Sequence, residues 1–139
     1  MDGDRSDGLG LTEERRFEND MNVLIVDDNA SVRRLLRRAI SAEASFIWEC
    51  GDGADAERAY GEHKPYIVLM DVRMSRMDGL AATRALRRAD PRAKVVIVTD
   101  YDDDDIRGAA SEAGASGYVL KQNLTELAEL VRSLANRKT

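Results

Sequence analysis

The chain has 139 residues, of which 43% are hydrophobic and 34% are charged, and its formal net charge is −5 at pH 7. This length suits one compact domain, and the acidic balance argues against direct binding of nucleic acid. The sequence has no apolar run of the ~18 residues that a membrane span needs, and no N-terminal apolar segment typical of a secretory signal. We therefore expect a soluble, cytoplasmic protein without membrane contact, in which the single cysteine, Cys50, is a buried thiol.

Residues 1–20 are polar and charged, and we expect them to form a flexible N-terminal tail before a single domain over 21–139. In that domain, short apolar runs alternate with segments of helical periodicity. The apolar runs predict strands over 22–26, 46–50, 66–70, 94–98 and 117–120. The periodic segments predict helices over 31–42, 53–60, 79–88, 106–113 and 124–135, the second of them ended by Gly61.

Strands that alternate with helices of this length indicate right-handed βαβ crossovers and a parallel sheet. The predicted fold class is therefore α/β, a doubly wound (βα)5 flavodoxin-like sandwich. Its parallel five-stranded sheet is expected in the order 2-1-3-4-5. Sheets of this kind bind their ligands at the carboxyl ends of the strands.

Polar side chains follow four of the predicted strands at their carboxyl ends. Asp27 and Asp28 follow the first strand, Asp71 the third, Thr99 the fourth and Lys121 the fifth. Any one of these is an ordinary strand-to-loop transition, but together, at the edge where such folds place their sites, they indicate a functional cluster. Clustered carboxylates repel each other unless a cation joins them, and hard oxygen ligands suit Mg²⁺. A carboxylate can attack phosphorus, while Lys121 supplies positive charge and Thr99 a hydroxyl donor for a transferred phosphoryl group.

Four motifs make this sequence resemble the receiver domains of two-component response regulators. They are VLIVDDN at 23–29, VLMDVRMSRMDG at 68–79, VIVTDYDD at 96–103 and GASGYVLK at 114–121. The resemblance covers the region from about 22 to 136. The last motif is most similar to receivers of the NarL/FixJ type, which usually carry a C-terminal helix-turn-helix domain, and we expect no such domain within these 139 residues.

The resemblance implies a phosphorylation-activated signalling switch rather than a conventional enzyme, with Asp71 as the phosphoacceptor. Asp27 and Asp28 would position Mg²⁺ (or Mn²⁺), together with Asp71 and the backbone carbonyl of Arg73. The phosphoryl group would come from the phosphohistidine of a sensor histidine kinase or of a phosphotransfer protein.

The resemblance also assigns the residues that respond to phosphorylation. Thr99 and Lys121 would bind the phosphoryl oxygens, and Tyr118 would be the aromatic switch that turns inward when Thr99 is drawn toward the phosphate. The surface of the last two predicted helices and the strand between them would then change its preference for partners. Those partners are expected to be a second copy of the chain, a downstream protein target or an output domain outside this chain.

Several residues depart from the family pattern, and three of them, Asp100, Arg73 and Tyr101, bear on phosphorylation. Asp100 stands where the family usually has Ala or Gly, and it adds a negative charge beside the switch threonine. This residue raises the alternative of a phosphorylation-independent interaction module, against which the intact set of site residues argues. Arg73 and Tyr101 are bulky at two positions that tune aspartyl-phosphate lifetime, and we expect them to lengthen it. Arg73 also stands where phosphohydrolases that use an aspartyl-phosphate carry a second Asp, which disfavours that enzyme class.

Other features favour structural interpretations. The run Asp102–Asp105 lacks the ligand spacing of a Ca²⁺ loop, and its charge suits the start of the next helix. His63 is expected in a solvated loop, and Trp48 is expected to pack against a helix. The first predicted helix presents either a solvated basic face or a kinase-docking surface, formed by Arg33, Arg34, Arg37 and Arg38.

Overall fold

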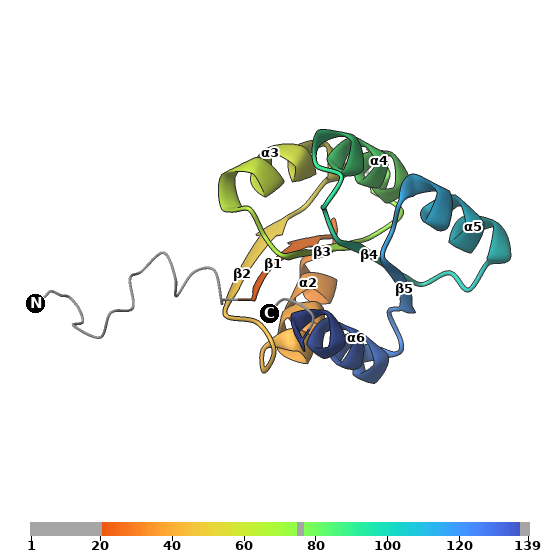
Figure 1. Cartoon of the computed structure of the whole chain (residues 1–139). Helices are drawn as coiled ribbons and strands as arrows, with labels where there is room; N and C mark the ends of the chain where they lie inside the picture. The colour runs from red at the N-terminus through yellow and green to blue at the C-terminus, as the bar shows by residue number, and fades with distance from the viewer. Residues whose placement is uncertain (1–20, 75–76, 137–139) are drawn as a thin grey trace, which may run out of the picture.

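The computed structural model describes residues 21–74 and 77–136, so the predicted tail over 1–20 lies outside the described residues (Figure 1). The strands are β1 (Asn22–Val26), β2 (Phe46–Cys50), β3 (Ile67–Met70), β4 (Val95–Thr99) and β5 (Gly117–Leu120). The helices are α2 (Ala30–Ile40), α3 (Gly53–His63), α4 (Gly79–Ala89), α5 (Asp104–Ala113) and α6 (Leu124–Asn136). No described helix is both long enough and apolar enough to cross a lipid bilayer.

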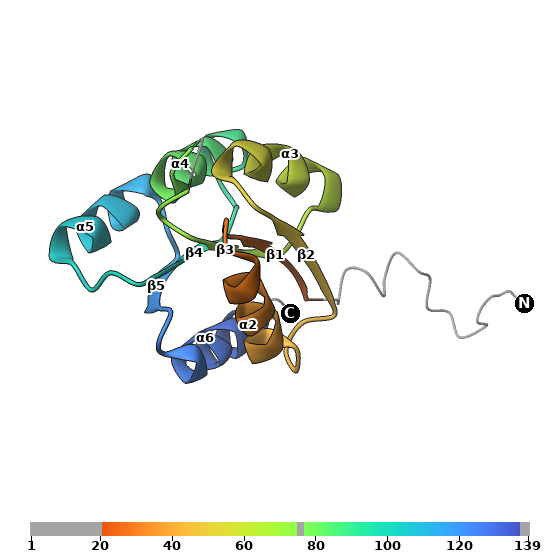
Figure 2. The same cartoon turned by 180° about the vertical axis from the view of Figure 1, so that it is seen from behind.

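The strands form one parallel sheet in the order β2-β1-β3-β4-β5, which confirms the predicted doubly wound fold. Helices α2 and α6 cover one face, and α3, α4 and α5 cover the other, as the two opposite views show (Figures 1 and 2). The order of the strands reverses beside β1 and β3, which are neighbours in the sheet. In a doubly wound sheet this reversal opens a crevice at the carboxyl ends of those strands.

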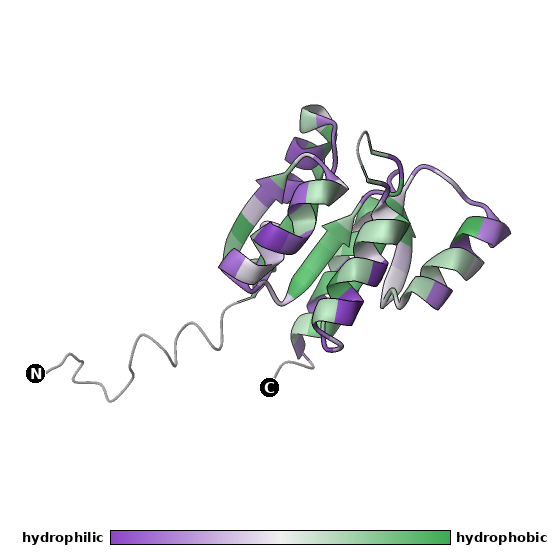
Figure 3. Ribbon diagram, turned by 90° about the horizontal axis from the view of Figure 1, so that it is seen from above, coloured by the Kyte–Doolittle hydropathy of each residue, from purple (hydrophilic) through white to green (hydrophobic). Residues whose placement is uncertain are grey.

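The core is aliphatic and lies in two layers, one on each side of the sheet. Alternate residues of β1 point to opposite layers: Val23 and Ile25 pack with α2 and α6, whereas Leu24 and Val26 pack with the other three helices. The hydropathy colouring shows apolar strands between helices whose polar residues face outward (Figure 3). Strands buried on both faces explain why each apolar run in the sequence is continuous rather than alternating.

Three helix boundaries differ from the prediction by two or more residues, and one of them is the end of α2, which lies at Ile40 rather than at residue 42. Helix α5 starts at Asp104, two residues early, because the Asp103 carboxylate accepts hydrogen bonds from the amides of Asp105 and Ile106. Helix α3 continues through Gly61 and is capped at Lys64, whose backbone is left-handed with φ 47°. A glycine inside a helix costs only about 1 kcal/mol, so its presence alone does not end one.

The longer α3 also changes the surroundings of His63. This residue ends the helix rather than standing in a loop, and its ring stacks on Trp48 with centroids 4.5 Å apart. The contact agrees with the prediction that Trp48 packs against a helix. Cys50 is half-buried rather than buried, its thiol lies 3.9 Å from the Asp52 carbonyl oxygen, and burial raises its pKa.

Candidate functional site

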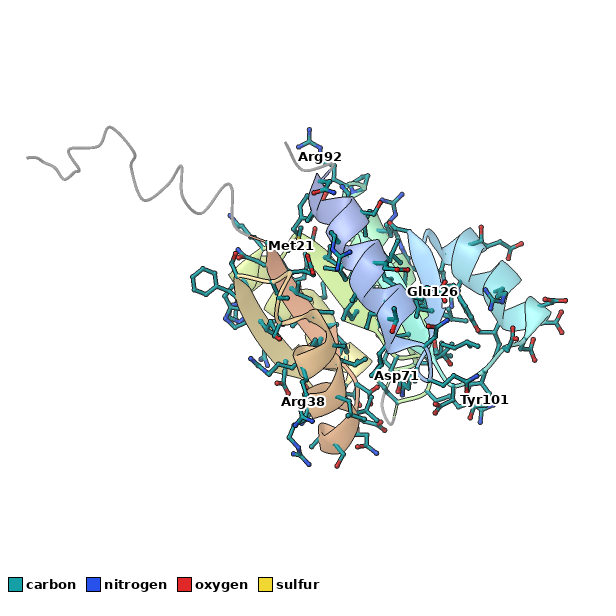
Figure 4. All side chains as sticks on the ribbon, turned by 90° about the horizontal axis from the view of Figure 1, so that it is seen from below. Met21, Arg38, Asp71, Arg92, Tyr101 and Glu126 are labelled. Atoms are coloured by element: carbon teal, nitrogen blue, oxygen red, sulfur yellow. The ribbon has the colours of Figure 1, made fainter. Side chains whose placement is uncertain are left out.

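The predicted site residues meet at one end of the sheet. Val26 of β1 pairs with Met70 of β3, so the residues that follow, Asp27 and Asp71, leave adjacent strands side by side. The side-chain view places Asp71 at the same end of the molecule as Tyr101, and Met21 at the opposite end (Figure 4). Asp27 and Asp71 therefore lie together at the carboxyl ends of their strands, as expected for a sheet of this kind.

Asp71 is a buried carboxylate with only 7% of its surface exposed. Its backbone amide donates to the Val26 carbonyl at 2.9 Å, which continues the β1–β3 pairing by one residue. Its Oδ1 accepts from the Val72 amide at 2.9 Å and lies 3.1 Å from the ammonium nitrogen of Lys121. At the carboxyl end of the sheet, the Asp71 carboxylate is therefore held by the Val72 backbone amide and by the ammonium group of Lys121.

Lys121 joins the two buried carboxylates. Its Nζ lies 2.9 Å from Asp27 Oδ2 and 3.1 Å from Asp71 Oδ1. The pKa of Asp71 is raised to about 6, chiefly by burial and then by the charge of Asp27, against the opposing effect of Lys121. Burial lowers the pKa of Lys121, but the two carboxylates outweigh burial and raise it. The single ammonium group of Lys121 thus offsets only part of the negative charge of Asp27 and Asp71.

Asp28 completes a group of three carboxylates. One oxygen each from Asp27, Asp28 and Asp71 lies within 4.8 Å of the others, and Asp28 is the exposed member. Among the described residues this is the group able to hold a metal ion, and the acidic run before α5 forms none. Three hard oxygen donors, one facing solvent and two buried beside a single lysine, fit a divalent cation such as Mg²⁺ that retains some of its water.

Gly79, the first residue of α4, lets that helix approach the Asp71 backbone. A Cβ atom at Gly79 would lie 1.7 Å from the Asp71 carbonyl oxygen, which no side chain can tolerate. The Gly79 amide donates to the Val72 carbonyl at 2.7 Å, and Asp78 caps the helix by accepting from the Ala81 amide. The loop after the candidate phosphoacceptor is therefore fixed at its far end by close backbone contact.

Thr99 ends β4 and is fully buried. Its Oγ1 accepts from the Tyr101 amide at 3.2 Å, and its carbonyl accepts from the Lys121 amide at 2.8 Å. Tyr118 lies on β5, where its hydroxyl donates to the Tyr101 carbonyl. The predicted switch pair therefore contacts one loop residue from two sides, with Thr99 bound to its amide and Tyr118 to its carbonyl.

Two arginine–tyrosine cation–π pairs lie at the loop that contains Tyr101. The guanidinium of Arg73 lies 4.5 Å from the centre of the Tyr101 ring, and that of Arg107 lies 4.4 Å from the centre of the Tyr118 ring. Arg107 also forms a 3.1 Å ion pair with Asp102. Asp100 is exposed beside this arrangement. The contacts of Tyr101 and Tyr118 with each other and with these two arginines thus form a continuous path from the Asp71 loop to α5.

Sequence reasoning missed the role of β2 at this site. Arg33 and Arg37 of α2 do not form a purely solvated face, because both bind the carboxylate of Glu49 on β2 at 2.8 Å. Arg33 also donates from Nη1 to the Asp27 backbone carbonyl at 2.6 Å. The one available signal was the i, i+4 spacing of the two arginines, which places them on the same side of a helix.

Comparison with known proteins gives consistent matches. Residues 23–132 match the family described as "Response regulator receiver domain". The transcriptional regulatory protein YxjL of Bacillus subtilis (strain 168) is 36% identical over 118 residues, which are 83% of this chain and 54% of YxjL. The chain thus spans about half the length of this relative.

Solved structures agree with these matches. A two-component response regulator of the LuxR family from Aurantimonas sp. SI85-9A1 is 34% identical, with a TM-score of 0.77, and the match covers 84% of this chain and 85% of that one. The CheX-CheY-BeF3-Mg²⁺ complex from Borrelia burgdorferi matches with 25% identity and a TM-score of 0.77 over 82% of this chain and 88% of that one.

Proposed function

The chain belongs to the response regulator receiver domain family, and we propose that its phosphorylation-activated switch works through Asp71 as the phosphoacceptor. The observation that carries this assignment is the position of Asp71, buried at the sheet edge with Lys121 at 3.1 Å and with Asp27 and Asp28 beside it. The pKa of Asp71 is raised to about 6, mainly by burial and then by the charge of Asp27, and perturbed pKa values of this kind cluster at functional sites.

The proposed reaction transfers a phosphoryl group between two side chains. An oxygen of the Asp71 carboxylate attacks phosphorus, the P–N bond of a partner's phosphohistidine breaks, and the imidazole leaves with its electron pair. Lys121, already beside Asp71, provides positive charge for the phosphoryl oxygens. Thr99 would donate its hydroxyl to another of these oxygens, and turning toward them would draw its Oγ1 away from the Tyr101 amide.

We assign the acidic group to Mg²⁺, with Mn²⁺ as a substitute. Asp27, Asp28, Asp71 and the backbone carbonyl of Arg73 would supply the protein ligands. When bound, the ion neutralises charge on the carboxylates and on the incoming phosphoryl group. Asp28 is the exposed member of this group, whereas the buried Asp27 also contacts Lys121 at 2.9 Å.

The output of the switch would be a change on the surface of α5, β5 and α6. Movement of Thr99 toward a phosphoryl group breaks one of the contacts on Tyr101, and the Tyr118 hydroxyl bond to the same residue is then free to rearrange. The partners we infer are a sensor histidine kinase or phosphotransfer protein upstream. Downstream, we infer a second copy, a target protein or an output domain.

Intact-mass spectrometry after incubation with Mg²⁺ and acetyl phosphate tests this function. We expect a single phosphoryl adduct that requires Mg²⁺ and is absent from the Asp71→Asn variant. An adduct retained by Asp71→Asn would move the acceptor to another residue. If wild type gives no adduct but Asp100→Ala does, the exposed charge at Asp100 blocks the reaction. If neither is labelled, the domain acts by binding alone.

A further inference from the structure

Arg33 connects three segments at the edge of the acidic group. From α2, its Nη1 donates to the backbone carbonyl of Asp27 at 2.6 Å, and its Nε donates to Glu49 of β2 at 2.8 Å. The side chain is only 21% exposed. A planar guanidinium can make both bonds at once because its N–H groups point in fixed and different directions. Arg33 therefore joins the β1–α2 loop to β2.

Glu49 holds this guanidinium in place. Its second oxygen binds Arg37 at 2.8 Å, and Arg37 also donates to the Ile47 carbonyl. Burial alone would raise the pKa of Glu49, but hydrogen bonds from Arg37 and Arg33 outweigh burial and hold that pKa below its ordinary value. Glu49 thus stays charged, and it offsets the positive charge that Arg33 brings toward a cation site.

The backbone carbonyl of Asp27 is one of four polar groups of this residue that each have a close partner. Its amide donates to the Cys50 carbonyl at 3.2 Å, its Oδ1 accepts from the Asn29 amide, and its Oδ2 contacts Lys121. The carbonyl belongs to the planar peptide unit that continues into Asp28. Fixing this oxygen therefore fixes the orientation of the peptide that carries the exposed ligand.

We propose that Arg33, oriented by Glu49, is a positioning residue that sets the Asp27–Asp28 peptide for divalent-cation binding. This inference rests on the proposed Mg²⁺ site. Arg33 itself is a positive group near the carboxylates, so removing its charge would strengthen cation binding by removing Coulomb repulsion between Arg33 and the cation. The positioning role predicts the opposite sign, which separates the two effects.

Calorimetric titration of MgCl₂ into wild type and into Arg33→Met at constant ionic strength tests the proposal. We expect Arg33→Met to bind Mg²⁺ about tenfold more weakly, at the lower end of the effect of outer-shell partners on metal affinity. Arg37→Met is the matched control: it removes an arginine that binds the same Glu49 but has no contact with Asp27. It should bind Mg²⁺ like wild type. Far-UV circular dichroism shows whether each variant is folded.

A second variant keeps the test decisive if Arg33→Met does not fold. Arg33→Lys retains the charge, but one ammonium group cannot reproduce the two fixed bonds, so binding should again weaken. Unchanged or tighter binding by a folded Arg33 variant would overturn the positioning role, and so would an equal loss in Arg37→Met. If wild type itself does not bind Mg²⁺, the metal site of the proposed function fails, and this inference fails with it.

Discussion

Replacing Asp71 by Asn should stabilise the protein at neutral pH in the absence of divalent cations. Asn resembles the protonated carboxyl group in size and polarity but cannot ionise. The Asp71 pKa is raised from 3.8 to about 6, so the folded protein holds this proton more tightly than the unfolded chain does. At 1.36 kcal/mol for each pKa unit, ionising the buried group costs up to about 3 kcal/mol.

The pH dependence follows from the sign of that shift. At about pH 3, below both pKa values, the carboxyl is protonated in folded and unfolded protein, so wild type and variant should have similar stability. As pH rises through about 6, the folded wild type must give up the proton and loses stability, whereas Asp71→Asn does not. The free-energy difference should therefore grow from near zero at about pH 3 to its full value at about pH 7.

Urea unfolding at several pH values, with a chelator present, measures this difference directly. Asp28→Asn is the control, because it removes the same charge from an exposed position and should change stability much less. Adding Mg²⁺ should stabilise wild type by about 2.7 kcal/mol at a hundred times its dissociation constant, and the Asn variant less. A variant that is less stable than wild type at pH 7, or a gap that does not change with pH, would refute this reasoning.

Two further predictions concern the loops on either side of the site. Gly79→Ala should destabilise the domain by at least about 3 kcal/mol in urea unfolding, because the new Cβ would overlap the Asp71 carbonyl. Gly61→Ala is its control: nothing lies within 4 Å of that Cβ, and the change should stabilise α3 by up to about 1 kcal/mol. If the stacked pair of Arg73 and Tyr101 slows attack by water, changing both to Ala should shorten the phosphoprotein half-life several-fold; an unchanged half-life would rule that out.

The strands and the acidic residues at their ends could be predicted because each depends on local pattern, whereas the strand order followed from the few topologies that right-handed βαβ units allow. Continuous apolar runs such as the one before Asp27 mark strands buried on both faces, and parallel pairing then brings their carboxyl ends to one edge. That rule places Asp27, Asp71 and Lys121 at one edge of the sheet, where Lys121 Nζ lies within 3.1 Å of both carboxylates. Asp27 and Asp71 follow the neighbouring strands β1 and β3, whereas Lys121 follows β5, two strands from β3, and its long side chain reaches both carboxylates.

Contacts that depend on packing between distant segments could not be predicted. The Arg33–Glu49 pair joins α2 to β2, and nothing in the sequence near either residue indicates the other. The requirement for glycine at position 79 arises from the approach of α4 to the Asp71 backbone, which is a property of the assembled loop. The start of α5 at Asp104 could have been predicted from the sequence, because Asp is a strongly preferred N-cap residue and stands at position 103.

The negative charge that makes ionised Asp71 destabilise the fold is also the basis of its proposed function. Two buried carboxylates share a single lysine, and an exposed third lies within 4.8 Å, so the group keeps negative charge that the protein does not neutralise. A fully compensated site would be more stable but would attract a divalent cation less strongly. Arg33 approaches the same group only through a backbone carbonyl, with its charge already offset by Glu49. The protein thus fixes the geometry of the site without adding a cation that would compete for its ligands.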